Sequence, residues 1–259
     1  MAISYVDQVV NSSSPTADAT LTYPGTLAID DLLILAVGVG DNDNVNIDMA
    51  VTTRIQVGTG WTLIPESDIH VNGATSDTDL GVYYKYYAGA DSSVVVNGAS
   101  SGGSDSSHAC VLKAFRGVKL EADGGPFDVT PVAASSTTGT AADPGSIDTT
   151  GTAGIWVVIA GAIAHTAGSA VTMTMPTNYT SNPAFRSHND TTDVTVGMGH
   201  RSDPGDPENP GTMTLSSTTG ATGWAALTMA LSQSVPPVVF DEVVRAPHHT
   251  SRIWSRDPR

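Results

Sequence analysis

The serine within GASSG (98–102) is the first candidate for chemistry, because this segment fits the G-x-S-x-G nucleophile motif. That motif works on a sharp turn between a strand and a helix, where the start of the helix supplies the oxyanion hole. Here the chain runs on as SSGGSDSS (100–107), which predicts no helix. A chain rich in serine and glycine also produces such matches by chance. We therefore assign Ser100 no catalytic role and predict that the protein is not an enzyme.

Two acidic loops offer oxygen ligands. The loop DNDNVNID (41–48) carries Asp41, Asp43 and Asp48, and calcium favours clustered carboxylates and carbonyls. The EF-hand pattern fails, because valine stands at its fifth position and glycine is missing from its sixth. We interpret the loop as solvated and keep calcium at the three aspartates as the alternative; no other cofactor is predicted. The loop DPGDPENPG (203–211) is interpreted as a rigid turn, because proline fixes the backbone at three of its positions.

The histidines do not form a recognisable metal motif. His188 and His200 flank a predicted strand, with Asp190 and Asp193 nearby. Their spacing does not place them on one face, and a structural zinc site needs about four convergent ligands. The adjacent histidines at 248–249 would point to opposite sides of an extended segment. We predict no metal site at any of these positions.

Four tyrosines surround a lysine in the segment VYYKYY (82–87). On a strand alternate side chains share a face, so Tyr83, Lys85 and Tyr87 lie opposite the rest. These three residues form a possible surface for a sugar or a neighbouring protein, because tyrosine is favoured at such surfaces. The favoured alternative is ordinary cross-strand packing, with the lysine stem lying along apolar neighbours.

The elements that carry these residues are predicted to be strands. Hydrophobic residues make up 40% of the 259-residue chain and charged residues only 14%, with 26 glycines. Runs rich in Val, Ile, Thr and Tyr end at NG, DPG and SGG turns, and no helical periodicity is visible. LLILAVGVG (32–40) and GIWVVIAGAIA (154–164) are continuously apolar, as expected for strands buried on both faces, and far short of a membrane span. The pattern predicts an all-β protein, an antiparallel, jelly-roll-like β-sandwich.

The sandwich is predicted to consist of two tandem repeats, residues 3–118 and 127–234. Five segments recur in the same order along the two repeats: 3–17 with 127–141, 27–40 with 148–164, 58–67 with 176–185, 80–98 with 193–215, and 107–118 with 223–234. We favour one sandwich over residues 1–235, because the connection between the repeats is short and each closing strand is apolar. Two small sandwiches in a row are the alternative.

Charge and cysteine content narrow the function classes. The formal net charge is −15, and affinity for phosphates depends on clustered Lys and Arg, so nucleic acid is excluded as the expected partner. Cys110 is the only cysteine; it cannot form an intrachain disulfide and is expected to be a small buried residue. The start MAISYVDQVV has neither a basic region nor a long apolar core, so we predict no signal peptide and no membrane partner.

The motifs DLLILAVGV, GWTLI, VYYKYYAGA and ACVLKAFRGV, followed by GIWVVIAGA, TMPTNYT, GTMTL and GWAALTMALS, resemble a family of β-sandwich proteins among the virion components of tailed bacteriophages. The resemblance covers about residues 3–234 and excludes the two acidic loops and the C-terminal segment. It implies a structural virion protein, assembled in the host cytoplasm, that decorates or cements the head through contacts with other virion proteins. The alternative is a tail or fibre module that binds carbohydrate on the host surface. Homo-oligomers are expected, and trimers are common in the group it resembles.

The C-terminal arm, residues 236–259, differs from the rest. Residues 1–235 hold 7 basic and 23 acidic residues, a formal charge of −16, whereas the arm holds 4 basic and 3 acidic residues, a charge of +1. We predict that the arm is extended and docks on a neighbouring subunit, since an extended segment can add to another sheet and arginine suits carboxylates. The docking residues we expect are Phe240, Arg245, Arg252, Trp254, Arg256 and Arg259. The alternative is a tail that lies on its own body or is disordered.

Overall fold

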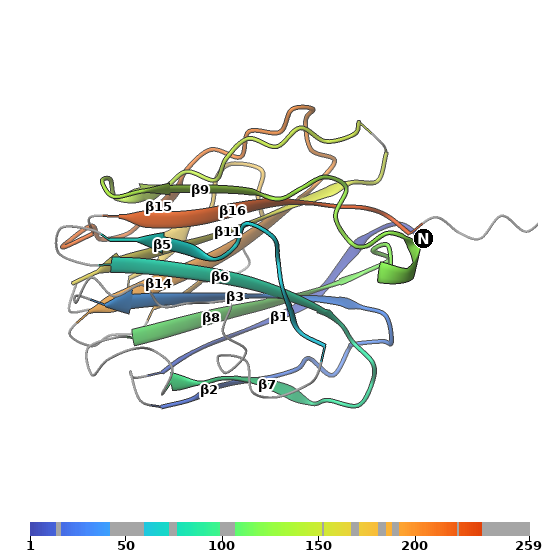
Figure 1. Ribbon diagram of the computed structural model, residues 1–259, viewed down its shortest axis with the longest axis horizontal. Helices are drawn as coiled ribbons and strands as arrows, with labels where there is room; N and C mark the ends of the chain where they lie inside the picture. The colour runs from blue at the N-terminus through green and yellow to red at the C-terminus, as the bar shows by residue number, and fades with distance from the viewer. Residues whose placement is uncertain are drawn as a thin grey trace, which may run out of the picture.

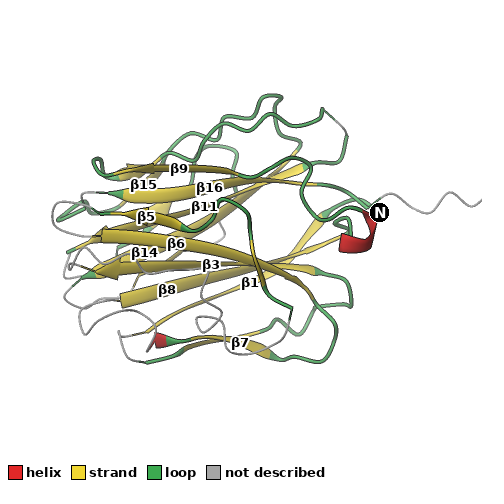
Figure 2. Cartoon of the chain, in the orientation of Figure 1, coloured by secondary structure: helices red, strands yellow, loops and turns green. Residues whose placement is uncertain are grey.

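The computed structural model describes residues 1–13, 17–41, 60–72, 77–98, 107–151, 153–166, 171–180, 185–187, 192–221 and 223–234. These residues form antiparallel strands and contain no α-helix, which confirms the predicted all-β fold class (Figure 2). A single turn of 3₁₀ helix, Glu121–Asp123, follows the first half of the chain. The arm at 236–259 lies outside the described residues, so its docking role stays a prediction.

Among the described residues, each half of the chain contributes eight strands. Those of the first half are β1 (Ser4–Ser13), β2 (Ala19–Thr22), β3 (Leu32–Asp41), β4 (Thr62–Leu63), β5 (Ile69–Val71), β6 (Asp77–Tyr86), β7 (Ser93–Val96) and β8 (Ser107–Arg116). Those of the second half are β9 (Val132–Ser136), β10 (Ala141–Ala142), β11 (Trp156–His165), β12 (Met173–Thr174), β13 (Phe185–Ser187), β14 (Asp193–Ser202), β15 (Met213–Leu215) and β16 (Trp224–Leu231).

The two halves share most of their strand pairing. In the first, β1, β8, β3 and β6 lie side by side, β4 and β5 both pair with β6, and β2 pairs with β7. In the second, the order is β9, β16, β11, β14 and β13, with β10, β15 and β12 in a small separate sheet. First beside eighth, third beside sixth, and second beside seventh are pairings typical of a jelly roll, whereas the fourth strands differ, because β4 pairs with β6 and β12 with β15. The sequence segments aligned as repeats therefore occupy matching places, although an origin by duplication stays a prediction.

The two large sheets pack face to face (Figure 1). Strand β3 lies opposite β11, β1 opposite β13, and β9 opposite β5, as an approximate twofold relation between the halves requires. The core between the sheets draws on both halves, with Ile34, Val82 and Phe115 on one side and Val158 and Leu227 on the other. Because this core is shared between the halves, the arrangement favours a single sandwich over two that merely follow one another.

The outer face of each large sheet is also covered. Leu33, Leu35 and Cys110 pack beneath the β2–β7 pair, and Ile159 packs beneath the small sheet of β10, β12 and β15, in one cluster with Met213. Strands β3 and β11 are therefore buried on both sides, which accounts for their continuous apolar sequences. The burial of Cys110, whose relative exposure is zero, is confirmed.

Candidate functional site

The tyrosine-rich segment forms core packing in place of an exposed platform. Tyr83 and Lys85 are buried, and Lys85 forms an ion pair with Asp91 on the loop before β7. Tyr87 is partly buried and packs edge-on against Tyr23 at 6.1 Å between ring centroids. The proposed surface of Tyr83, Lys85 and Tyr87 is therefore corrected, and the packing alternative describes these side chains. Strands β2 and β7 cover the face of the sheet that carries Tyr83 and Lys85. The sequence around these two residues does not indicate this cover.

The predicted calcium loop lies outside the described residues except for the backbone of Asp41 at the end of β3. Ser100, His188 and Asp190 also lie outside them. Within the described residues, no group of three or more His, Cys, Asp or Glu side chains is arranged to hold a metal ion. No helix in this part of the chain is long and apolar enough to cross a membrane.

The turn at 203–211 is held together by a buried carboxylate. Glu208 is 2% exposed and accepts hydrogen bonds from Arg201 Nη1 at 2.8 and 3.0 Å. It also accepts from the Gly205 backbone at 2.7 Å and from the Tyr179 hydroxyl at 2.9 Å. The sequence pattern does not distinguish Glu208 from the other acids of this loop, yet it is a structural anchor rather than a solvated side chain. Its partner Arg201 comes from β14, which the spacing of the loop alone could not identify.

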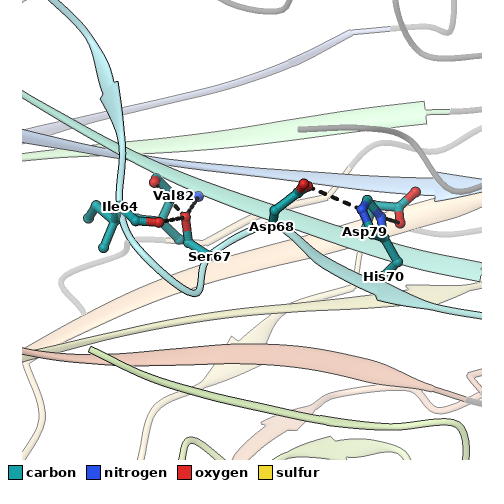
Figure 3. A network of polar contacts seen from close by, with 6 residues as sticks. All are labelled: Ile64, Ser67, Asp68, His70, Asp79 and Val82. Atoms are coloured by element: carbon teal, nitrogen blue, oxygen red, sulfur yellow. Dashed lines mark hydrogen bonds and ion pairs between the residues drawn. The ribbon is translucent and has the colours of Figure 1, made fainter. Parts of the chain in front are cut away.

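A second polar network joins β5 to β6 (Figure 3). His70 stands directly opposite Asp79, and its Nδ1 lies 2.6 Å from Asp79 Oδ1. Its Nε2 lies 3.2 Å from Asp68 Oδ1. The hydroxyl of Ser67 bonds to the backbone, 2.7 Å from the carbonyl oxygen of Ile64.

A serine, a histidine and an aspartate thus lie close together, but they do not form a nucleophile triad. A triad needs the serine Oγ against one imidazole nitrogen and the aspartate against the other. Here a carboxylate lies against each ring nitrogen of His70. The Ser67 hydroxyl instead hydrogen-bonds to backbone carbonyls and stabilises the turn before β5 (Figure 3). We assign this network to joining β5 to the sheet. It was not among the sequence predictions, although the spacing of Asp68 and His70 was a visible signal.

A pair of titratable side chains, Lys113 and His200, lies inside the shared core. Lys113 projects from β8 between the sheets, is fully buried, and places its Nζ 3.2 Å from Nδ1 of His200 on β14. Burial lowers the pKa of the Lys113 amine to about 7. Burial, and then the nearby Lys113 charge, lower the pKa of His200 to about 4. At neutral pH the imidazole is therefore neutral and available as the acceptor for the lysine amine.

Aromatic rings enclose this pair. The His200 imidazole stacks on Tyr5 at 4.7 Å and on Trp156 at 5.5 Å between centroids. The edge of the same ring cluster includes Phe115, 5.7 Å from the imidazole, and Lys113 Nζ lies 5.5 Å from the Tyr5 ring centroid. A cation over a ring face is favourable, which partly offsets the cost of burying the amine. His200 and Asp193 occupy opposite ends of β14, so they do not converge on one ligand.

A polar cavity of about 500 Å³ opens beside the ring cluster. Trp156 and His200 line it together with Asn178, Thr180, Arg201, Ser202 and Asp203. Asn178 and Asp203 have left-handed backbones, with φ of 73° and 57°, and both side chains are exposed. An aromatic wall with amide, carboxylate and guanidinium groups around it can hold a small polar ligand.

A second, more apolar cavity of about 320 Å³ lies near the N-terminus and the end of the described chain. Its lining includes Met1, Ile29, Val118 and Leu120, with Ser234 at its edge. Met1 and Ile29 are 64% and 68% exposed, the only large hydrophobic side chains of the described residues that are exposed.

Comparisons with protein-family models, with curated proteins and with solved structures each gave no match.

Proposed function

We propose that this chain is a non-enzymatic structural protein of a phage virion, which decorates or cements the head through protein–protein contacts. The observation that carries the proposal is the jelly-roll strand order of both halves, joined to an arm of opposite charge. Jelly rolls recur in viral capsid proteins, although a fold alone does not define a function. The partners in this proposal are other virion proteins and further copies of the chain, arranged as a trimer in the virion itself.

The covering of both large sheets supports the proposal. Because small sheets and loops bury the outer faces, the broad strand surfaces are already occupied within the chain. Contacts with other subunits then fall on the ends of the sandwich and on the arm. A body of charge −16 stays soluble by mutual repulsion, while an arm of charge +1 is attracted to an acidic neighbour.

Particles that lack the protein provide the test. Full-length protein should co-sediment with such particles, and a chain ending at residue 235 should fold but no longer co-sediment. A full-length variant with the arm's four arginines replaced by glutamine separates charge from length and should bind weakly, with a reduced dependence on salt. Circular dichroism shows that each variant is folded. The proposal is abandoned if full-length protein fails to bind particles or if the truncated chain binds equally well.

The alternative is a tail or fibre module that binds carbohydrate, and the polar cavity beside Trp156 favours it. Sugars pack on aromatic rings and bond to planar polar groups, and Asn178, Arg201 and Asp203 supply such groups. A glycan array, with and without calcium, tests this candidate. Asn178→Asp and Asp203→Asn keep shape and tolerate the left-handed backbone while changing the ligand chemistry. An array with no bound glycan eliminates the candidate.

A further inference from the structure

We propose that the apolar cavity beside Ser234 receives Val238, Val239 and Phe240 from the arm of a second copy of this chain. The inference deepens the proposed function and rests on it, since it names the partner and the surface through which the copies join. Its starting point is the convergence of the two exposed large hydrophobic side chains of the described residues, Met1 and Ile29, on one cavity.

The turn that presents Ile29 is rigidly held. Asp31 is 1% exposed and accepts two hydrogen bonds from Arg116, each 2.8 Å long, and one of 2.7 Å from the Ala28 backbone. The backbone of the turn is also paired with Tyr87 in both directions, at 2.9 and 2.8 Å. Ile29 therefore projects from a fixed frame, and filling the cavity requires little ordering of this side.

The chain reaches the cavity at the point where the arm begins. The Ser234 backbone N–H donates to the Gly117 carbonyl at 2.9 Å, and the Met1 ammonium donates to the Ser234 carbonyl at 2.8 Å. These bonds fix the exit of the chain at the cavity's edge. Each arm thus starts beside the cavity of its own chain, so copies arranged head to tail in a closed ring can each place an arm in the cavity of the next copy.

The sequence after Ser234 favours the second copy over the chain's own cavity. Pro236 and Pro237 fix φ and favour an extended backbone, which advances about 3.1 Å per residue. At that rise, the four steps from Ser234 to Val238 span up to about 12 Å. Ser234 itself lines the cavity of its own chain, so an extended stretch of this length is better matched to the cavity of a neighbouring copy.

Chemistry matches the two partners. Val238, Val239 and Phe240 are apolar, as are Met1, Ile29, Val118 and Leu120 in the cavity.

Cysteine cross-linking between separate copies provides the test. Ile29→Cys and Val239→Cys proteins, each in a Cys110→Ala background, are mixed and oxidised. We expect a disulfide-linked pair of chains in the mixture. Thr138→Cys, exposed at the opposite end of the sandwich, replaces Ile29→Cys in the control and should give no such pair with Val239→Cys. Equal cross-linking with Thr138→Cys, or none with Ile29→Cys, overturns the inference. An intrachain disulfide alone in the double variant Ile29→Cys/Val239→Cys also overturns it.

Sedimentation of the unlabelled protein gives an independent readout. Full-length protein should associate with itself, and Ile29→Asp should weaken this association by about tenfold or more, as for an anchor in a docked interface. Because Ile29 is exposed, the substitution leaves the fold intact. Loss of self-association in Ile29→Asp with particle binding retained separates this inference from the proposed function. If the wild type does not self-associate but still binds particles, this inference fails and the proposed function stands.

Discussion

Lys113 Nζ lies 3.2 Å from His200 Nδ1, within the core that the two large sheets share. Alternate residues of β8 face this core, and the neighbours of Lys113 on the same face are Val111 and Phe115. Lys113 pairs with Ile34 of β3, and the equivalent pair in the second half joins Met229 of β16 to Val158 of β11. Met229 is apolar and buried. The lysine is therefore a titratable group in a layer that is apolar apart from His200, and its protonation is linked to folding.

Replacing Lys113 with methionine should raise stability at pH 7 and remove a pH dependence. The folded amine has a pKa of about 7 and the unfolded one about 10.5, so the unfolded chain binds more protons between these values. The free energy of unfolding of the wild type should thus rise from pH 7 to pH 9, in total by a few kcal/mol, and that of Lys113→Met should not. Urea unfolding at these two pH values measures the difference.

The comparison stops at pH 9, because tyrosines titrate above that pH. Burial raises the pKa of Tyr5 in the folded protein to about 12, so its ionisation would add a second pH dependence to the stability. Lys119→Met, at a half-buried lysine of the surface, is the control and should keep the slope of the wild type. A slope unchanged in Lys113→Met would show that another group titrates.

Acid should destabilise the fold through His165 and His200. Burial lowers the pKa of each imidazole from 6.5 to about 4, with a further contribution from Lys113 at His200. The unfolded histidines take up protons first, so stability should decline as the pH falls from about 6.5 to 4. His165→Gln retains a polar partner for Thr195, whose Oγ1 lies 2.9 Å from His165 Nε2, and should lose less stability over this range. Identical acid-unfolding curves for variant and wild type would contradict the assignment to His165.

The fold could be predicted from the sequence because its signals are local. Continuous apolar runs at 32–40 and 154–164 indicate strands covered on both sides, and both lie at the centres of the large sheets. The tandem repeats inferred from the recurring segments stay a prediction, although the two halves share most of their strand pairing. Strands β2 and β7, which cover Tyr83 and Lys85, lie elsewhere in the sequence. The local sequence therefore allowed these two side chains to be either buried or exposed.

The polar networks could not be predicted because their members meet only in the folded chain. Lys113 and His200 are 87 positions apart and come from different sheets. Arg201 and Glu208 are near in sequence, but Tyr179 joins them from the segment after β12. Composition indicates how many such groups exist, whereas the register of opposed strands decides which of them meet.

Glu208→Gln should destabilise the protein by about 1–3 kcal/mol, because a buried acceptor of several hydrogen bonds becomes a group with two donors. The Arg201 guanidinium would lose its carboxylate partner, and the amide nitrogen would face the arginine in either orientation and the Gly205 N–H in one of them. Asp206→Asn, at an exposed acid of the same turn, is the control and should change stability by less than about 0.5 kcal/mol. Chemical denaturation compares the two. Equal effects would show that burial of Glu208 does not decide the stability of the turn.

Gly38→Ala should separate the sheets locally and destabilise the protein by about 1–3 kcal/mol, the usual cost of overpacking. A Cβ at Gly38 would overlap a Val196 methyl and lie 3.1 Å from the Ala162 Cβ, both on the opposite sheet. The only relief is movement of β3 away from β11 and β14, because these neighbours are short or β-branched side chains on rigid strands. Gly25→Ala is the matched control, since a Cβ there meets nothing within 4 Å. It should be neutral or slightly stabilising through the unfolded chain. Equal melting temperatures for Gly38→Ala and Gly25→Ala in thermal unfolding would contradict close contact between the sheets at β3.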